Sequence, residues 1–199
     1  MIAVITGDII NSSHSKNQEW LKQLKIGLNQ FGGSPKDWEI FRGDSFQLRV
    51  SIEKVLYTAF YLKASIKQIK GKDVRMAIGI GREMHKSQKI SESNGEAYQN
   101  SGKCFESLRK ANLMIRSFDS EWDNTLNLMI ALYLLTGNKW TPTEANIIKT
   151  VFENPSKNQQ EIAEELNKKQ GNISVALKRA GFDELNQLIT YYEQQTQLL

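Results

Sequence analysis

The chain has 199 residues, of which 40% are hydrophobic and 24% are charged, and this composition is typical of a globular protein. A single cysteine excludes an internal disulfide, and no apolar stretch reaches the roughly 20 residues that a membrane-spanning helix needs. No charged start followed by an apolar core and a cleavage site is found, so we expect a cytoplasmic protein with no membrane partner.

The net charge of +4 favours anionic partners, but its distribution along the chain matters more than the total. Residues 1–138 contain 19 Lys and Arg against 14 Asp and Glu, whereas residues 139–199 contain 7 against 8. The basic excess therefore lies in the first part, and the overall charge gives no argument that the tail binds DNA.

Strand-like and helix-like segments alternate over residues 1–117. The sequence predicts strands at IAVI, WEIF, FQLRV, VRMAIGIG and NLMIRSF, and helices at NQEWLKQLKIGLNQF, EKVLYTAFYLKASIKQI and EAYQNSGKCFESLRK. Ser15 is a candidate N-terminal cap of the first helix. The order β-α-β-β-α-β, with an added helix and strand, predicts an α/β (α+β) fold with a ferredoxin-like or palm-type sheet and helices on one face.

Two Gly-Asp pairs stand against these strands. VITGDIINSS places Asp8 near the end of the first strand, and FRGDSFQ places Asp44 in a hairpin turn where Gly43 tolerates positive φ. Two carboxylates at neighbouring strand ends are the minimum oxygen ligands for Mg²⁺ or Mn²⁺ carrying a nucleotide triphosphate, and the free amides of Ile9 to Ser12 would approach its phosphates. The alternative is that both aspartates are only turn residues.

Four segments of the chain, including the two Gly-Asp pairs, resemble signature blocks of a known class of proteins. VITGDIINSS, FRGDSFQLRV, RMAIGIG and NGEAYQNSGK occur in the order and approximate spacing of the signature blocks of class III nucleotide cyclases and related GGDEF-like palm domains. The whole chain resembles the SatD family of bacterial proteins, with a palm-like block followed by a helix-turn-helix tail. The resemblance implies that Asp8 and Asp44 bind Mg²⁺ or Mn²⁺ and that the protein is a homodimer with its site between two subunits.

The sequence departs from the cyclase pattern at two positions. Where the cyclases carry an Asn and, four residues later, a charge-stabilising Arg, this chain has Gln99 and Lys103, and lysine lacks the planar guanidinium fork. Since such arginines contribute roughly 10³- to 10⁵-fold in rate, we expect nucleotide binding without turnover. The alternative is a metal-dependent cyclase-like or phosphoryl-transfer enzyme that uses Gln99 and Lys103. The nucleotide-binding candidates are Ile9, Asn11, Ser12, Gly43, Arg82 and Lys103.

The segment DSEWDNTLNLMIALYLLTG predicts a helix with an acidic start that stops at Gly137, and its apolar content predicts that it is buried. We place a palm domain at residues 1–117, a connecting helix at 118–138 and a helix-turn-helix domain at 139–199. Thr141-Pro142-Thr143-Glu144 then opens a helix that runs to about Glu153.

The tail segment NQQEIAEELNKKQGNISVALKRAGFDEL has the internal order of a helix-turn-helix, with Ala163 at the close approach of two helices and Ile173, Val175 and Leu177 packing the second. The second helix would enter the major groove with its amide and hydroxyl side chains on base edges and the flanking cations on phosphates. The DNA-binding candidates are Lys168, Lys169, Gln170, Asn172, Ser174, Lys178 and Arg179. The alternative is a three-helix docking or dimerisation module.

The last segment, FDELNQLITYYEQQTQLL, carries Leu185, Leu188, Ile189 and Tyr192 on one helical face, which predicts a dimerisation helix. Together these features predict a DNA-binding transcriptional regulator whose cyclase-like domain senses a nucleotide or a divalent metal.

Overall fold

The computed structural model describes residues 1–14 and 19–199, so the predicted cap Ser15 lies outside the described residues. Five strands form one sheet in the order β2-β3-β1-β4-β7, in which β1 is antiparallel to both β3 and β4 and β7 is parallel to β4. The strands are β1 (Ile2–Ile10), β2 (Trp38–Phe41), β3 (Ser45–Val50), β4 (Asp73–Gly81) and β7 (Leu113–Arg116). The order of β2, β3, β1 and β4 is ferredoxin-like, and the α+β prediction is confirmed.

Helices cover both faces of this sheet, so the expectation of helices on one face is wrong. Helices α1 (Glu19–Asn29) and α2 (Val55–Lys67) share an apolar cluster with Ala3 and Ile5 of β1, whereas Val4 on the opposite face packs with Ala97 and Tyr98 of α3 (Glu96–Ser107). The reason lies in the small residues of β4. A Cβ built on Gly79 would lie 2.1 Å from the Ser101 amide nitrogen, so glycine is required for α3 to approach this closely.

A short antiparallel ribbon follows β4. It consists of β5 (Glu83–His85) and β6 (Asn94–Gly95), with the 3-10 turn η2 (Ile90–Glu92) between them. Arg49 of β3 ties this ribbon to the sheet because its guanidinium contacts Glu83 of β5 at 3.3 Å. The same guanidinium contacts Asp37, which directly precedes β2, at 2.8 Å. Two further 3-10 turns are η1 (Ser12–His14) and η3 (Thr196–Leu198).

The second half of the described chain is helical, with α4 (Ser120–Gly137), α5 (Pro142–Glu153), α6 (Gln159–Glu165), α7 (Gln170–Arg179) and α8 (Phe182–Gln195). The predicted start of α5 is confirmed, since Thr141 and Glu144 form a reciprocal capping box ahead of Pro142. Asp119 caps α4 by accepting bonds from two backbone amides, which agrees with the predicted acidic start of that helix.

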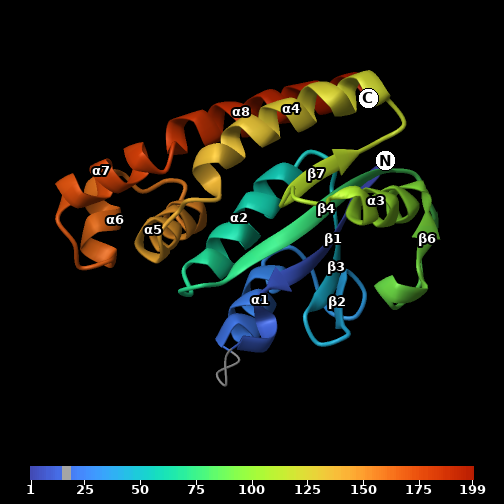
Figure 1. Ribbon diagram of the computed structural model, residues 1–199, viewed down its shortest axis with the longest axis horizontal. Coiled ribbons are helices and arrows are strands. Elements are labelled where there is room, and N and C mark those ends of the chain that lie inside the picture. The colour runs from blue at the N-terminus through green and yellow to red at the C-terminus, as the bar shows by residue number, and fades with distance from the viewer. Residues whose placement is uncertain (15–18) are drawn as a thin grey trace.

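Helix α5 packs on α2, and α8 runs beside α4, so the helical part is joined to the sheet part (Figure 1). The hydroxyl of Tyr57 donates to the Phe152 carbonyl at 2.8 Å, that of Tyr61 to the Glu153 carboxylate at 2.6 Å, and that of Tyr192 to the Ile52 carbonyl at 2.7 Å. One apolar cluster extends through both parts, so buried contacts cross the predicted boundaries near residues 117 and 138.

Helix α4 is not the buried helix that its apolar sequence predicted. Leu128, Leu132 and Leu135 are 63%, 60% and 66% exposed, because only one side of the helix packs on β7 and α8. Asn127, which interrupts the apolar run, bonds both backbone groups of Ile115 at 2.8 and 2.9 Å and thereby satisfies the outer edge of β7. None of the helices that the structure describes is long and apolar enough to cross a membrane.

The predicted dimerisation face of α8 is buried inside the chain rather than exposed to a partner. Leu185, Leu188, Ile189 and Tyr192 are all buried within the chain itself, where they pack in the main apolar cluster with α2 and α4. These four side chains are therefore unavailable to a second subunit, and that prediction is wrong.

Candidate functional site

Polar side chains gather on the α3 side of the sheet, where β1 ends beside β3. Helix α3 contacts β4, β1 and β7, and its Ser101 hydroxyl lies 3.0 Å from the Thr6 hydroxyl of β1. Asp8 follows Thr6 on the same side of the strand, since alternate residues share a face. Its cross-strand neighbours are Ser45 of β3 and Arg75 of β4, so the Asp8 carboxylate lies between the two strands that flank β1.

The Asp8 carboxylate is paired with an arginine that the sequence analysis did not assign to the site. Arg75 donates from Nε to Oδ1 at 3.2 Å and from Nη2 to Oδ2, which is a two-pronged ion pair. The Asp8 hydrogen bond raises the pKa of Arg75, and the guanidinium also lies 5.0 Å above the Phe105 ring of α3. The two side chains are 22% and 35% exposed, so the pair is accessible from solvent.

Asp44 lies in the predicted hairpin turn, directly before Ser45. Arg42 and Gly43 have φ of 53° and 91°, so the turn needs positive φ at two residues rather than at the glycine alone. The Asp44 carboxylate accepts a hydrogen bond from the Ser12 hydroxyl at 2.5 Å. Asp44 and Asp8 are thus at the same end of two paired strands, each already bonded to a neighbour.

The expectation of free amides from Ile9 to Ser12 is wrong at Ile9. Its amide donates to the Asp44 carbonyl at 3.2 Å, and its side chain is buried in the core. Asn11 adopts a φ of 63°, its side-chain amide donates to the Gly71 carbonyl at 3.2 Å, and its own carbonyl accepts from Lys72. The segment after β1 is therefore held by bonds to two neighbouring loops.

The other predicted nucleotide contacts lie apart from Asp8 within one chain. Gln99 and Lys103 are exposed on the side of α3 away from the sheet, because Ala97, Ser101 and Cys104 occupy its buried side. Arg82 is exposed at the end of β4, and its backbone amide donates to Glu96 at 3.1 Å.

The donors near β1 fit a cation that arrives with phosphates better than a cation held by protein alone. Among residues 1–14 and 19–199, no three or more His, Cys, Asp or Glu side chains are grouped as a metal site. Magnesium, however, is commonly bound by one or two carboxylates together with the phosphates of its ligand. Asp8 would supply a carboxylate and Arg75 a positive charge for a phosphate. Asp44 directly precedes Ser45, which lies opposite Asp8, and its carboxylate bonds Ser12, so it would have to turn toward Asp8 to join this site.

Arg75 could have been found from the sequence by one signal. It is the only charged residue inside the apolar run VRMAIGIG, and a charge in a central strand must find a partner on its neighbour. Its pairing with Asp8 depends on the register of β1 against β4, which the sequence does not reveal without the strand order.

The second candidate surface is formed by α7 and the segment that precedes it. Ile162 and Ala163 of α6 and Ile173 and Leu177 of α7 are buried, as the helix-turn-helix pattern predicted. Val175 is 57% exposed, so its predicted packing role is wrong: it follows Ile173 by only two residues and therefore points to the opposite side of α7. The exposed side of this surface carries Lys168, Lys169, Gln170, Asn172, Ser174, Lys178 and Arg179.

Basic side chains stand at both ends of α7, and uncharged polar ones lie between them. Lys168 and Lys169 precede the helix, while Lys178 and Arg179 are in its last turn. Two residues of this surface also contact other side chains of the same chain: Gln170 donates to Gln159 at 3.0 Å, and Arg179 lies 3.4 Å from Glu144. The α6–α7 end projects away from the sheet at the far end of the molecule from β6 (Figure 1), so this surface is open to a large partner.

The fold and these two surfaces define an α+β protein in which a ferredoxin-like sheet carries a three-helix unit, α5–α7, on helix α2. Comparison with family models, with curated proteins and with solved structures gives no match.

Proposed function

We propose that this protein is a cytoplasmic DNA-binding transcriptional regulator, similar to the SatD family, whose ferredoxin-like part senses a nucleotide triphosphate together with Mg²⁺ or Mn²⁺. The observation that carries the proposal is the exposed side of α7, which has uncharged polar side chains in its middle and cations at both ends. This distribution suits a helix in the major groove, where amides and hydroxyls reach base edges and cations reach the phosphates beside the groove.

The residues of α7 divide into two roles under this proposal. Gln170 and Ser174 share one side of α7, and Asn172 lies beside the exposed Val175. These amide and hydroxyl groups reach base edges from the two flanks of the helix, and Val175 adds an apolar contact suited to a thymine methyl group. Lys168, Lys169, Lys178 and Arg179 bind phosphates and position the helix. Because two such helices usually read paired half-sites, the proposal includes a homodimer.

The sensing part of the proposal rests on the Asp8–Arg75 ion pair. A divalent cation alone must displace Arg75 from Asp8, and that exchange leaves the guanidinium without its carboxylate. A cation that arrives with a triphosphate provides a partner for each side chain: the cation binds Asp8 and Asp44, and a phosphate binds Arg75. The pair thus favours the metal–nucleotide complex over the bare metal.

The enzymatic alternative is ranked second. It requires Gln99 and Lys103 to reach the reacting phosphate. Helix α3 covers the sheet face that carries Asp8, but these two side chains project from the outer side of α3, away from the sheet. A nucleotide site that used them would have to combine side chains from two copies of the chain.

The proposal is tested by selecting bound sequences from a random pool of duplex DNA. We expect enrichment of a site with two half-sites about 34–36 Å apart, which is one turn of the DNA helix. A triple Gln170→Ala, Asn172→Ala, Ser174→Ala variant should retain salt-dependent binding but lose the sequence preference, whereas a control with Asn29→Ala, Gln30→Ala and Ser91→Ala should keep it. If the parent enriches no sequence, or if the triple variant keeps the preference, the assignment of α7 is wrong.

A further inference from the structure

Helix α4 presents an apolar seam to solvent on the side away from β7. Leu128, Leu132 and Leu135 are 60% to 66% exposed, and Ala131 beside them is exposed as well. The leucines are spaced by four and three residues, which places them in one line along the helix, as in the contact seam of paired helices. A contiguous row of large exposed apolar side chains on a folded protein marks an interaction surface.

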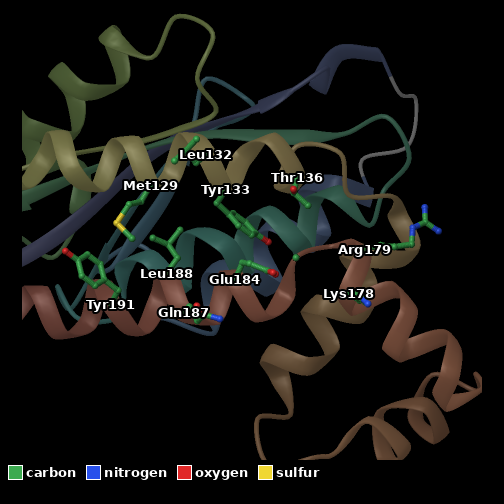
Figure 2. A pocket seen from close by; sticks show the side chains of 11 residues that line it. Met129, Leu132, Tyr133, Thr136, Lys178, Arg179, Glu184, Gln187, Leu188 and Tyr191 are labelled. Carbon is green, nitrogen blue, oxygen red and sulfur yellow. The ribbon is translucent and has the colours of Figure 1, made fainter.

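A groove runs along this seam between α4 and α8, with a volume of about 750 Å³. Its apolar wall contains Met129 and Leu132 of α4 and Tyr191 of α8. In Figure 2 the basic side chains Lys178 and Arg179 lie at one end of the groove and Met129 and Tyr191 at the other. The groove therefore offers space for apolar side chains from a partner helix that lies on the leucines.

Helix α4 has an acidic residue at its start and a basic residue just after its end, so two antiparallel copies of it would bring opposite charges together. Glu121 is exposed in the first turn, and Lys139 is exposed just after the last, so the two stand nine residues on either side of Ile130. The angular position of both matches the leucine seam, since 18 residues make five turns of an α-helix. A parallel partner would place Glu121 against an identical carboxylate, whereas an antiparallel copy places it against a lysine.

We propose that the α4 seam is the interface of a homodimer in which two copies of α4 pack antiparallel around a two-fold axis beside Ile130 and Ala131. In this register Leu128 lies opposite Leu132 of the partner subunit, and Glu121 lies opposite Lys139 of the partner subunit. The contact is isologous, so each favourable pair occurs twice. The leucine seam uses neither α7 nor Asp8, and the groove beside it meets α7 at Lys178 and Arg179. The test of the dimer does not depend on DNA binding.

The first test is sedimentation of the full chain over a concentration series. The parent should sediment as a dimer at about 100 μM, and Leu132→Glu should raise the dissociation constant at least about 100-fold, because it buries a carboxylate in the seam. Met84→Glu, at a side chain that is 77% exposed on β5, is the matched control and should leave the dimer unchanged. Circular dichroism melts of all three proteins establish that each is folded.

The register is tested by exchanging the charges. Glu121→Lys and Lys139→Glu should each weaken the dimer about tenfold or more, because each change affects two contacts, and the double variant should restore the parent affinity. A double Leu128→Cys, Leu132→Cys variant should form intersubunit disulfides, because these two positions face each other in this register, whereas Ser91→Cys should not. The native Cys104 is 2% exposed and will not interfere. A parent that stays monomeric, a Leu132→Glu variant that stays dimeric, or a double exchange that restores nothing overturns the proposal.

Discussion

Two clusters of oppositely charged side chains include Asp73 and Arg75 of β4, and they differ in their access to solvent. In the inner cluster, Asp73 accepts bonds from Lys63 at 2.9 Å and from Lys67 at 3.1 Å, and the Lys63 side chain is 1% exposed. In the outer cluster, two residues further along the strand, Arg75 pairs with Asp8, and these side chains are 35% and 22% exposed.

The inner cluster joins parts of the chain that are distant in sequence. Lys63 also donates to the Asn138 side chain at 2.9 Å and Lys67 to the Asn138 carbonyl at 2.9 Å, which connects α2 and β4 to the end of α4. Burial lowers the pKa of Lys63, although Asp73 opposes that effect. The two clusters therefore differ in accessibility more than in charge: the inner one is closed to solvent, and the outer one is open to it.

The largest expected effect is on the inner cluster. Asp73→Ala should lower the free energy of unfolding by about 3–5 kcal/mol, because it leaves two buried ammonium groups without their carboxylate. Urea unfolding measures this, with Asp183→Ala on the exposed side of α8 as the control. A loss below about 1 kcal/mol would show that water reaches Lys63 and would remove the contrast between the clusters.

Alkaline pH should weaken the interior while leaving the outer pair charged. Burial raises the pKa of Tyr98 to about 12 and raises that of Tyr61 further, whereas unfolded tyrosine titrates near 10. The folded state therefore keeps protons that the unfolded state loses, and the stability present below pH 10 falls as pH rises toward 12, by about 1.4 kcal/mol per pH unit for each tyrosine.

Urea midpoints measured from about pH 10.5 to 11.5 report this loss. The range lies above the pKa of an unfolded lysine, so the titration of Lys63 adds little to the slope. A double Tyr61→Phe, Tyr98→Phe variant should show a shallower fall than the parent. Equal slopes would mean that these two hydroxyls ionise as readily in the folded protein as in the unfolded one.

On the outer pair, Asp8→Asn should affect ligand binding far more than folding. The stability of the unliganded protein should change by less than about 1 kcal/mol, since the ion pair is partly exposed. The thermal stabilisation of the parent by Mn²⁺ with a nucleotide triphosphate, which corresponds to about 2.7 kcal/mol at 100 times the dissociation constant, should disappear. Differential scanning fluorimetry measures the ligand-induced shift in melting temperature of Asp8→Asn and of the control Asp183→Asn. Persistence of the full shift in Asp8→Asn would reject the cation site.

A smaller effect of opposite sign is expected at the other half of that pair. Arg75→Gln frees Asp8 from its competing cation, so Mn²⁺ alone should stabilise this variant by about 1 kcal/mol more than the parent. The added stabilisation from the triphosphate should shrink, because its phosphate loses the guanidinium. The exposed Arg116→Gln is the control, and an unchanged response to Mn²⁺ alone would mean that Arg75 does not regulate access to Asp8.

The sequence predicted features that depend on local order and missed those that depend on tertiary placement. The alternation of strands and helices, the acidic start of α4 and the start of α5 at Thr141 follow from neighbouring residues, and the structure confirms them. The exposure of Leu132 and the pairing of Arg75 with Asp8 depend on which elements lie against each other, and hydropathy along one segment carries no record of that.

For α7 the sequence predicted the buried Ile173 and Leu177 but grouped the exposed Val175 with them. Ile173, Val175 and Leu177 alternate, and a period of two suits a strand, whereas helical geometry buries the first and third and exposes the second. The buried face of α8 was recognised correctly as apolar, but its partner proved to be the chain's own α2 and α4. In both cases the missing information was the neighbour of the segment.

The most direct test of the account is the DNA affinity of a variant that carries Lys168→Ala, Lys169→Ala, Lys178→Ala and Arg179→Ala, measured by fluorescence anisotropy across salt concentrations. A control variant removes the same charge at exposed lysines elsewhere, with Lys22→Ala, Lys25→Ala, Lys36→Ala and Lys110→Ala. The α7 variant should bind at least about 100-fold more weakly on every sequence, and its salt slope should fall by about three to four per subunit, while the control matches the parent. Equal affinity and equal salt slope in the α7 variant and the parent would contradict DNA binding through this surface.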